Sequence, residues 1–459
     1  MVASLFHPLN IFLLGLGGGF VIPLLYRLGK PWLHAGFWLA LAGIVAVSGV
    51  SLVEVYRSGA PIEVLTAGFA PPLSINLRFG LQEGFFAVSV GLVSLLGALH
   101  LWDRLRGNYG ALLLYLILVM GIDGMVMTRD LFNLFVFLEI VSIATYGLLA
   151  LDRTPAAIGA AFKFIMATVI ASTFFLLGTV LLYYVTGTLN IDTLIAERGE
   201  ITGPIGATAL LMVLACLILE LKPFPANGWG LDVYETAPSG VASMVSVGVS
   251  AGVFFALWKL LPLFEGQLGI IAISGGITFL FSNLVGCKQT KVQRLLGYSS
   301  ISQMGLMTLA LALLTEIGAT ASIPLVVGGL FINHLLAKAG LFWLAGVLKQ
   351  DDVDARTSLS GRPLFHRSTA MLARVYQATG GAVPLVGIGG IDSPESALQK
   401  IEAGAALLQL YTGLIYEGPS LIGRIKQHLD ATCRTRGVSN ISALTGARVA
   451  EWAAKPLDG

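Results

Sequence analysis

Long apolar runs separated by short polar loops fill the first 350 residues of the chain. A helix of about 20 apolar residues crosses the hydrocarbon core of a bilayer. Backbone groups in lipid must form their hydrogen bonds within the spanning segment. We therefore expect an all-α polytopic membrane bundle with about eleven transmembrane helices over residues 1–350. The expected spans lie near 11–28, 36–56, 85–103, 110–128, 131–151, 158–186, 205–222, 239–262, 268–286, 297–315 and 322–349.

The pattern changes after residue 350. A polar, mixed stretch leads into the β-like run "AVPLVGIGGIDS", the helical "PESALQKIEAGA", a second β-like run "ALLQLYTGLIYEGPS" and the amphipathic "LIGRIKQHLDATCRTRG". This helix–strand–helix–strand–helix order is typical of a parallel α/β fold. A closed (β/α)₈ barrel needs about 250 residues. Residues 351–459 are therefore predicted to form a separate, partial α/β segment, a TIM-barrel fragment.

Composition supports a membrane protein and limits its chemistry. Hydrophobic residues make up 56% of the chain and charged residues 12%, against about 25% charged residues in soluble domains. This composition makes the lipid bilayer the expected surroundings. The net charge of +2 gives no reason to expect a nucleic-acid partner. Cys216, Cys287 and Cys433 are too far apart for a metal-binding pattern, and no metal site is expected. No cleavable signal peptide is evident, and the first apolar run is interpreted as the first span.

Basic residues concentrate in alternate loops. Because basic loops stay in the cytoplasm, the N-terminus is predicted to lie outside the cell and the segment after residue 350 in the cytoplasm. The protein is predicted to reside in the cell inner membrane. A miscounted span would invert the C-terminal half. The loops assigned to the cytoplasm contain Arg27 and Lys30, Arg104 and Arg106, Arg153, and Lys288, Lys291 and Arg294; the intervening loops contain Arg57, Arg78, Arg129 and Arg198.

Five ionisable residues inside the spans are the candidate site. A charge within a span is costly and indicates function. Glu139 lies mid-span, Glu220 and Lys222 end another span, and His334 and Lys338 are four residues apart on one helix face. Acids, histidine and lysine in such positions can relay protons, because burial brings lysine closer to neutrality.

Three other charged residues in the spans are less informative. Asp123 is a further candidate, whereas Lys163 and Lys259 have an equally good explanation as structural ion pairs or side chains that reach the interface. The stretch "ELKPFPANGWG" puts two prolines and two glycines just after a span. Proline breaks helices, and helices broken at membrane depth are typical of transporter ion sites. "GYSSISQMG" adds polar side chains that can hold water at the start of a later span.

Four stretches resemble the antiporter-like membrane subunits of respiratory complex I and the Mrp cation/proton antiporters. They are "DLFNLFVFLEIVSIATYGLLAL", "PFPANGWGLDVYETAPSGVASM", "QRLLGYSSISQMGLM" and "NHLLAKAGLFWLAG", in family order. The resemblance implies two inverted five-helix repeats, proton or cation translocation, partner membrane subunits, and no cofactor in this domain. It implies that Glu139 pairs with a lysine two spans later, and that His334 and Lys338 link two half-channels.

The sequence departs from the family pattern in three places. Glu220 occupies the usual lysine position and Lys222 follows two residues later, so either Lys222 reaches back through the local break or the relay differs. Lys291 stands where the family usually has an acid. The last family spans, with the second broken helix, do not follow Lys349, so the second repeat is expected to be truncated.

The tail resembles the C-terminal part of class 2 dihydroorotate dehydrogenase, a flavin-dependent barrel enzyme. "LSGRPLF", "PLVGIGGIDS" and "LLQLYTGLIYEGP" carry the resemblance. It implies that Gly361, Gly390, Tyr411 and Thr412 contact FMN; the alternative is that the glycines serve only the turns. The catalytic base of that family belongs to the missing first two-thirds, so the tail alone is not expected to oxidise dihydroorotate.

Three interpretations of the whole chain follow. The first is a translocating membrane subunit with an appended tail. The second is a membrane-tethered, FMN-dependent dihydroorotate dehydrogenase (quinone), present only as a fragment. The third concerns the join, which would be an engineered fusion, a product of truncation or a result of misassigned gene boundaries, because each half ends where its family does not.

Overall fold

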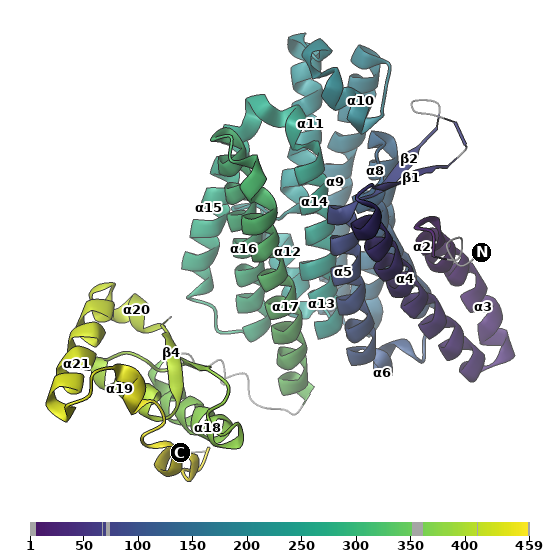
Figure 1. Ribbon diagram of the computed structural model, residues 1–459. Helices are drawn as coiled ribbons and strands as arrows, with labels where there is room; N and C mark the ends of the chain where they lie inside the picture. Colours follow the sequence, from purple (N-terminus) through teal and green to yellow (C-terminus); the bar gives the residue numbers. More distant parts are fainter. Residues whose placement is uncertain (1–5, 67, 70–73, 351–360, 411, 458–459) are drawn as a thin grey trace. The chain divides into compact units, whose positions relative to one another are not determined.

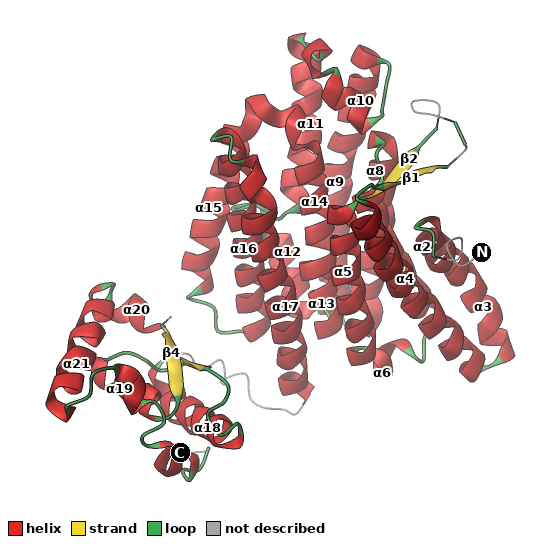
Figure 2. Ribbon diagram, viewed as in Figure 1, coloured by secondary structure: helices red, strands yellow, loops and turns green. Residues whose placement is uncertain are grey.

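The computed structural model describes the whole chain except residues 1–5, 67, 70–73, 351–360, 411 and 458–459. The chain divides into two compact units, Met1–Ala355 and Arg356–Gly459. Helices dominate both units, and strands are few (Figure 2).

The first unit is a bundle of long helices (Figure 1). Its α-helices are α2 (Leu9–Phe12), α3 (Gly18–Leu28), α4 (Lys30–Ser58), α5 (Leu81–His100), α6 (Trp102–Leu105), α7 (Tyr109–Met127), α8 (Leu131–Leu149), α9 (Pro155–Thr186), α10 (Ile191–Ala196), α11 (Gly203–Glu220), α12 (Gly228–Thr236), α13 (Ser239–Met244), α14 (Ser250–Leu260), α15 (Leu268–Gly286), α16 (Val292–Glu316) and α17 (Ile323–Gln350). Shorter turns are the π-helical η1 (Leu13–Gly17) and η4 (Val245–Val249) and the 3₁₀ segments η2 (Ala150–Asp152), η3 (Arg198–Glu200), η5 (Leu261–Gln267) and η6 (Thr320–Ser322).

The described residues include ten helical stretches long and apolar enough to cross a membrane. One of them runs from Ser239 to Gly286 over 48 residues, and the non-helical backbone at Phe264 divides it. Counting its two halves separately gives eleven passages, in agreement with the prediction. Large apolar side chains such as Phe20 and Leu325 are 77% and 81% exposed. Such surfaces are stable in lipid, so the unit is a multi-pass membrane bundle.

One helix is interrupted where the prolines and glycines predicted a break. Helix α11 ends at Glu220, α12 begins at Gly228, and residues 221–227 between them are not helical. Pro223 and Pro225 lack backbone donors, and the N–H of Phe224 donates to Thr278 Oγ1 at 3.0 Å. Lys222 has a left-handed backbone (φ 59°), which turns the chain sharply.

A small β-structure closes one end of the bundle. Strands β1 (Ile62–Leu65) and β2 (Asn76–Phe79) form an antiparallel hairpin in which Ile62 pairs with Phe79. Leu77 bridges to Thr128, and Asp130 bridges to Asn190. The hairpin therefore contacts the loop after α7, and that loop in turn contacts the loop before α10.

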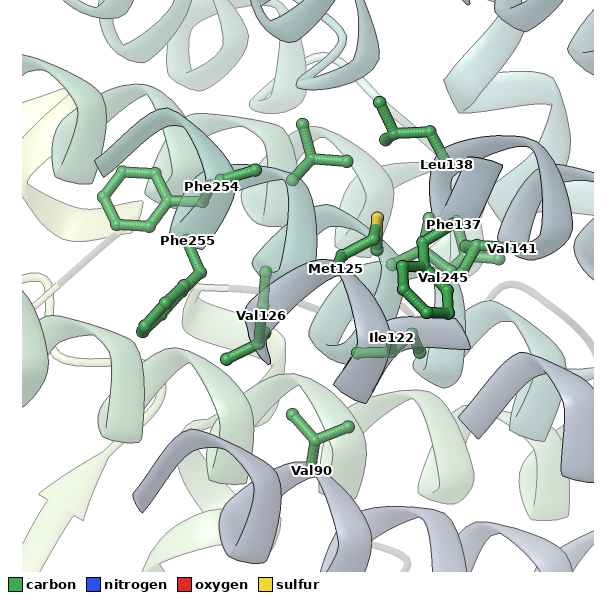
Figure 3. Close-up of a cluster of buried hydrophobic side chains, with 14 of the residues drawn as sticks. Val90, Ile122, Met125, Val126, Phe137, Leu138, Val141, Val245, Phe254 and Phe255 are labelled. Carbon is green, nitrogen blue, oxygen red and sulfur yellow. The ribbon is translucent and has the colours of Figure 1, made fainter. Parts of the chain in front are cut away.

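The interior of the bundle is tightly packed and apolar. Figure 3 shows side chains from α5, α7, α8, η4 and α14 gathered in one cluster, among them Ile122, Phe137 and Val245. Glycines allow the close approach: a Cβ at Gly124 would lie 2.3 Å from the ring of Phe137. This packing surrounds the polar groups described below.

The second unit has the predicted order of helices and strands. Strands β3 and β4 pair in parallel, with α19 between them. The second β-like run ends earlier than expected, because the chain turns into α20 at Thr412. Two strands form a βαβ unit rather than a barrel. The elements are η8 (Arg362–Leu364), α18 (Phe365–Ala378), β3 (Leu385–Ile388), α19 (Pro394–Glu402), β4 (Ala405–Gln409), α20 (Thr412–Glu417), α21 (Ser420–Arg436), η9 (Ile441–Leu444) and α22 (Val449–Ala453).

Candidate functional site

Two acidic side chains lie near the broken helix. Glu139 is half-buried in the middle of α8, and Glu220 is buried at the last residue of α11. The charge of Glu139 acts on the Glu220 carboxylate, and so does the charge of Lys222. The structure thus brings three of the predicted site residues into one electrostatic cluster.

Lys222 is buried in the break and turns back toward α11. Its side chain is 1% exposed, and its ammonium donates to the Glu220 carbonyl at 3.2 Å and to Ser250 Oγ at 2.8 Å. The same ammonium lies 5.3 Å from the centre of the Trp229 ring. Gly230 makes room for the lysine, because a Cβ there would lie 2.5 Å from Lys222 Cδ. The left-handed backbone at Lys222 and the small Gly230 together place the ammonium near Glu220.

A π-helical turn carries the next polar groups. Ser250, which receives the Lys222 hydrogen bond, donates in turn to the Val245 carbonyl at 3.0 Å. Ser246 Oγ lies 2.7 Å from Ser300 Oγ on α16. π-Helical turns occur frequently at functional sites. In this protein, η4 places Ser246 against α16, and the residue that follows η4, Ser250, contacts the broken helix.

His334 and Lys338 form the second predicted group, on α17. His334 is fully buried, with Nε2 3.3 Å from the Ser246 carbonyl, and its Nδ1 has no partner among the residues that the structure describes. Lys338 is 6% exposed and donates to Ser299 Oγ at 2.6 Å. His334 therefore reaches η4, and Lys338 reaches α16.

Ser250 contacts the first group and the Ser246 carbonyl contacts the second, and neither serine was predicted. They lie three and seven residues after Ser243 in an otherwise apolar span, a spacing that puts serines on one helix face. That spacing was the available signal in the sequence. Ser299 and Ser300 belong to the polar span start that was predicted to hold water.

Lys163 and Lys259, for which a functional and a structural role were both left open, form structural contacts. Lys163 is 59% exposed and forms an ion pair with Asp232 at 2.6 Å. Lys259 is buried, and its ammonium donates to the carbonyls of Met125, Val126 and Thr128 at 2.8, 3.2 and 2.7 Å. Lys259 therefore caps the C-terminal end of α7 and does not reach the interface.

The basic loop before α16 also forms ion pairs. Lys291, which stands in the place of the usual acid, pairs with Glu235 on α12. Arg294 bridges Asp232 and Glu235 at 2.9 and 2.8 Å. These contacts tie the second half of the broken helix to α16.

In the tail, protein atoms fill the spaces next to the predicted flavin glycines. A Cβ at Gly390 (φ +76°) would lie 2.5 Å from Phe365 Cα, and a Cβ at Gly361 (φ +81°) would lie 3.0 Å from Thr412 Cγ2. Gly361 and Thr412 are thus neighbours, while Tyr411 lies outside the described residues. Packing and turn geometry are sufficient to explain these two glycines, and FMN contact stays a prediction. The described part of the chain also holds no cluster of three or more His, Cys, Asp or Glu side chains that could bind a metal.

Both parts of the chain match known protein families. A model of the "NADH:quinone oxidoreductase/Mrp antiporter, TM" family matches residues 128–387, and a model of dihydroorotate dehydrogenase matches residues 345–433. The chain is 30% identical to NADH-quinone oxidoreductase subunit N of Desulforudis audaxviator over 353 residues, covering 74% of this chain and 69% of that protein. Both predicted resemblances are confirmed.

Two further relatives match over smaller shares of their length. A Na(+)/H(+) antiporter subunit of Alkalihalophilus pseudofirmus is 30% identical over 322 residues, which cover 68% of this chain and 64% of that protein. Dihydroorotate dehydrogenase (quinone) of Brucella anthropi is 44% identical over 144 residues, covering 31% of this chain and 38% of that enzyme. The chain therefore spans less than two thirds of either protein.

Solved structures of membrane complexes share the fold. A chain of the membrane-bound sulfane sulfur reductase, an archaeal respiratory membrane complex, superposes with a TM-score of 0.72 at 26% identity, covering 97% of this chain and 99% of that chain. A chain of the Mrp complex from Dietzia sp. DQ12-45-1b superposes with a TM-score of 0.69 at 22% identity, covering 98% and 80%. By its sequence matches, this chain belongs to the NADH:quinone oxidoreductase/Mrp antiporter transmembrane family.

Proposed function

We propose that the membrane unit translocates protons or another monovalent cation as one subunit of a larger membrane complex. The observation that carries the proposal is Lys222, an ammonium buried in a broken helix beside Glu220 and hydrogen-bonded to Ser250. Buried charge at a helix break is typical of ion pathways. The names of the relatives support the same conclusion, since one is an oxidoreductase membrane subunit and another belongs to a Na(+)/H(+) antiporter.

The proposed relay begins at Glu139 and Glu220. A proton bound by either carboxylate weakens its attraction for Lys222, and a proton lost strengthens it. The lysine ammonium can then lose a proton through Ser250, because a serine hydroxyl both accepts and donates hydrogen bonds. In this proposal, Lys222 replaces the lysine that the family usually has at the position of Glu220 in this chain.

The proposed relay continues to α17. Ser246 contacts both Ser300 and His334, and Lys338 contacts Ser299. The unpartnered Nδ1 of His334 needs a hydrogen-bond partner, and a bound water would supply one and extend the path. His334 and Lys338 would pass the proton on along α17.

Ion flux tests the relay. The complete complex would be reconstituted in vesicles, and proton entry driven by an imposed membrane potential would be followed with a trapped pH-sensitive dye. Glu139→Gln, Lys222→Met and Lys338→Met should each slow the flux by about tenfold or more, which corresponds to ~1.4 kcal/mol in the barrier. Lys163→Met is the matched control, because it removes an exposed lysine from the same unit, and its flux should stay within about twofold of the original. Unchanged flux in Lys222→Met would reject the relay.

We also propose an inner-membrane location with the N-terminus outside and the tail in the cytoplasm. The distribution of basic loops supports this orientation. A single cysteine introduced at exposed Gly107, in a cysteine-free background, should react with an impermeant maleimide only after the cytoplasmic side is opened. A cysteine at exposed Gly59 should react in intact cells. The reverse pattern would invert the proposed topology.

For the tail, we propose a fragment of a (β/α) barrel without dihydroorotate dehydrogenase activity of its own. The parallel pair β3 and β4 with α19 between them supports the barrel origin, as does the 44% identity to the Brucella enzyme. FMN contact by Gly361, Gly390, Tyr411 and Thr412 stays a prediction, and so does the truncated inverted repeat of the membrane unit. Quenching of FMN fluorescence by the purified chain, with dihydroorotate oxidation assayed in parallel, tests the tail; oxidation would reject this proposal.

A further inference from the structure

A carboxyl group outside the proposed relay is buried without a partner. Asp123 lies on α7 and is 1% exposed. Neither of its carboxylate oxygens has a hydrogen-bond partner in the part of the chain that the structure describes. Buried polar groups in proteins are almost always hydrogen-bonded, so Asp123 requires an explanation.

The surroundings of Asp123 are apolar. Its neighbours in sequence, Ile122 and Met125, belong to the cluster in Figure 3, together with Phe137 of α8 and Val245 of η4. Glycines bring these helices close: a Cβ at Gly248 would lie 2.9 Å from the Ile122 side chain. Asp123 is therefore flanked in sequence by residues of this apolar cluster.

Charged groups on the helices packed against α7 have contacts elsewhere. Lys259 of α14 binds the carbonyls at the end of α7, and Glu83 of α5 accepts from the N–H of Gly80. Glu139 of α8 acts on Glu220, and Tyr115 of α7 itself donates to the Ser94 carbonyl. None of these groups is hydrogen-bonded to Asp123 within the described residues.

Two physical consequences follow. An ionised carboxylate without a donor is very costly in an apolar interior, so this conformation favours the uncharged acid. Burying a leucine at this position would cost less free energy than burying an aspartate. An ionisable residue inside a membrane span is therefore taken as a functional site.

The π-helical segment connects Asp123 with the relay. Segment η4 contacts α7 through Gly248, presents the Ser246 carbonyl to His334, and leads directly to Ser250, the partner of Lys222. A π-helical turn is a local irregularity that favours rearrangement at functional sites. Movement of η4 would therefore change the packing of α7, which carries Asp123, and the surroundings of Lys222.

We propose that Asp123 is a further proton-binding site of this pathway, held as the acid in the apolar interior and exchanging its proton with water when α7 and η4 separate. The step is a simple transfer: the carboxyl O–H gives its proton to an entering water, and the carboxylate later takes a proton back. This inference rests on the proposed translocation.

Carbodiimide labelling tests the protonation of Asp123 independently of flux. Dicyclohexylcarbodiimide is apolar and adds to protonated carboxyl groups within membranes. In the complete complex, the peptide that contains Asp123 should carry the adduct at neutral pH, as read by peptide mass spectrometry. Asp152, a surface carboxylate paired with Arg104, is the internal control and should stay unmodified. An unmodified Asp123 peptide, in a sample where Glu220 is labelled, would overturn the proposal.

Asp123→Asn tests the role in transport. Asparagine has nearly the shape of the neutral acid but cannot exchange a proton, so the complex should assemble normally while flux falls about tenfold or more. Unchanged flux in Asp123→Asn, with wild-type flux lost in Lys222→Met, would reject the role of Asp123 and leave the relay standing. Flux that is insensitive to both substitutions would reject the proposed function itself, and the labelling result would still report whether Asp123 is protonated.

Discussion

Lys259 should contribute more to stability than any exposed lysine of the membrane unit. Its ammonium satisfies three buried carbonyls at the C-terminal end of α7, of Met125, Val126 and Thr128. Helix ends leave such carbonyls without partners inside the helix. Lys259→Met keeps the length of the side chain but removes all three hydrogen bonds.

The magnitude follows from the unsatisfied carbonyls. Leaving one buried acceptor without a donor costs about 1–3 kcal/mol. Methionine avoids the desolvation of a buried ammonium, which offsets part of that loss, and we expect a net loss of about 3 kcal/mol. The matched control is Lys163→Met, which removes a 59% exposed lysine from an ion pair with Asp232. Exposed ion pairs contribute only ~0–1 kcal/mol, and Arg294 still pairs with Asp232 in that variant.

Unfolding of the detergent-solubilised chain measures the difference. Both variants and the original would be denatured under one set of conditions, with helix loss followed by circular dichroism. The midpoint should fall clearly for Lys259→Met and stay near the original for Lys163→Met. Lys259→Arg should recover part of the loss, because it restores a cation with several donors. Equal midpoints for the two methionine variants would refute the structural role of Lys259.

Three other predictions follow, two from glycines in close contact with their neighbours and one from a buried lysine. Gly230→Ala should displace Lys222, whose Cδ would lie 2.5 Å from the new Cβ, and slow vesicle flux about tenfold (~1.4 kcal/mol), whereas Gly228→Ala, with open space around its Cβ, should not. Burial lowers the pKa of Lys400 to about 8, so the unfolded tail binds more protons than the folded tail between about pH 8 and 10.5. The stability of the tail, measured as resistance to thermolysin, should therefore rise with pH over this window. Lys400→Met should remove that rise. Gly390→Ala should unfold the tail, because its Cβ would lie 2.5 Å from Phe365 Cα, whereas Gly423→Ala, with nothing nearby, should leave protease resistance intact.

The spans and the break could be predicted from the sequence because their causes are local. Apolar run length fixes a transmembrane helix, and Pro223 and Pro225 cannot continue one. The tail's order of elements was equally clear from its alternation of β-like and helical runs. The fold resemblance rested on motifs that the family matches then confirmed.

The geometry of the site was not predictable, because it depends on contacts between distant helices. Lys163 and Lys259 looked alike in sequence, yet one lies at the surface and the other binds three carbonyls. Whether Lys222 reached back toward Glu220 depended on its backbone φ of 59°, which hydropathy does not encode. The spacing of Ser243, Ser246 and Ser250 indicated one helix face, but a helical wheel drawn with 3.6 residues per turn does not contain the π-helical register of η4, which sets the direction of Ser246.

The break between α11 and α12 has a consequence for the field around the site. Aligned peptide dipoles give the C-terminal end of a helix about half a negative charge and the N-terminal end about half a positive charge. Here the end of α11 and the start of α12 meet within the stretch from Glu220 to Gly228, so both partial charges lie next to Lys222. The backbone therefore offers a counter-charge of either sign. A change of protonation at Lys222 or Glu220 is therefore partly offset by fixed charges of the backbone.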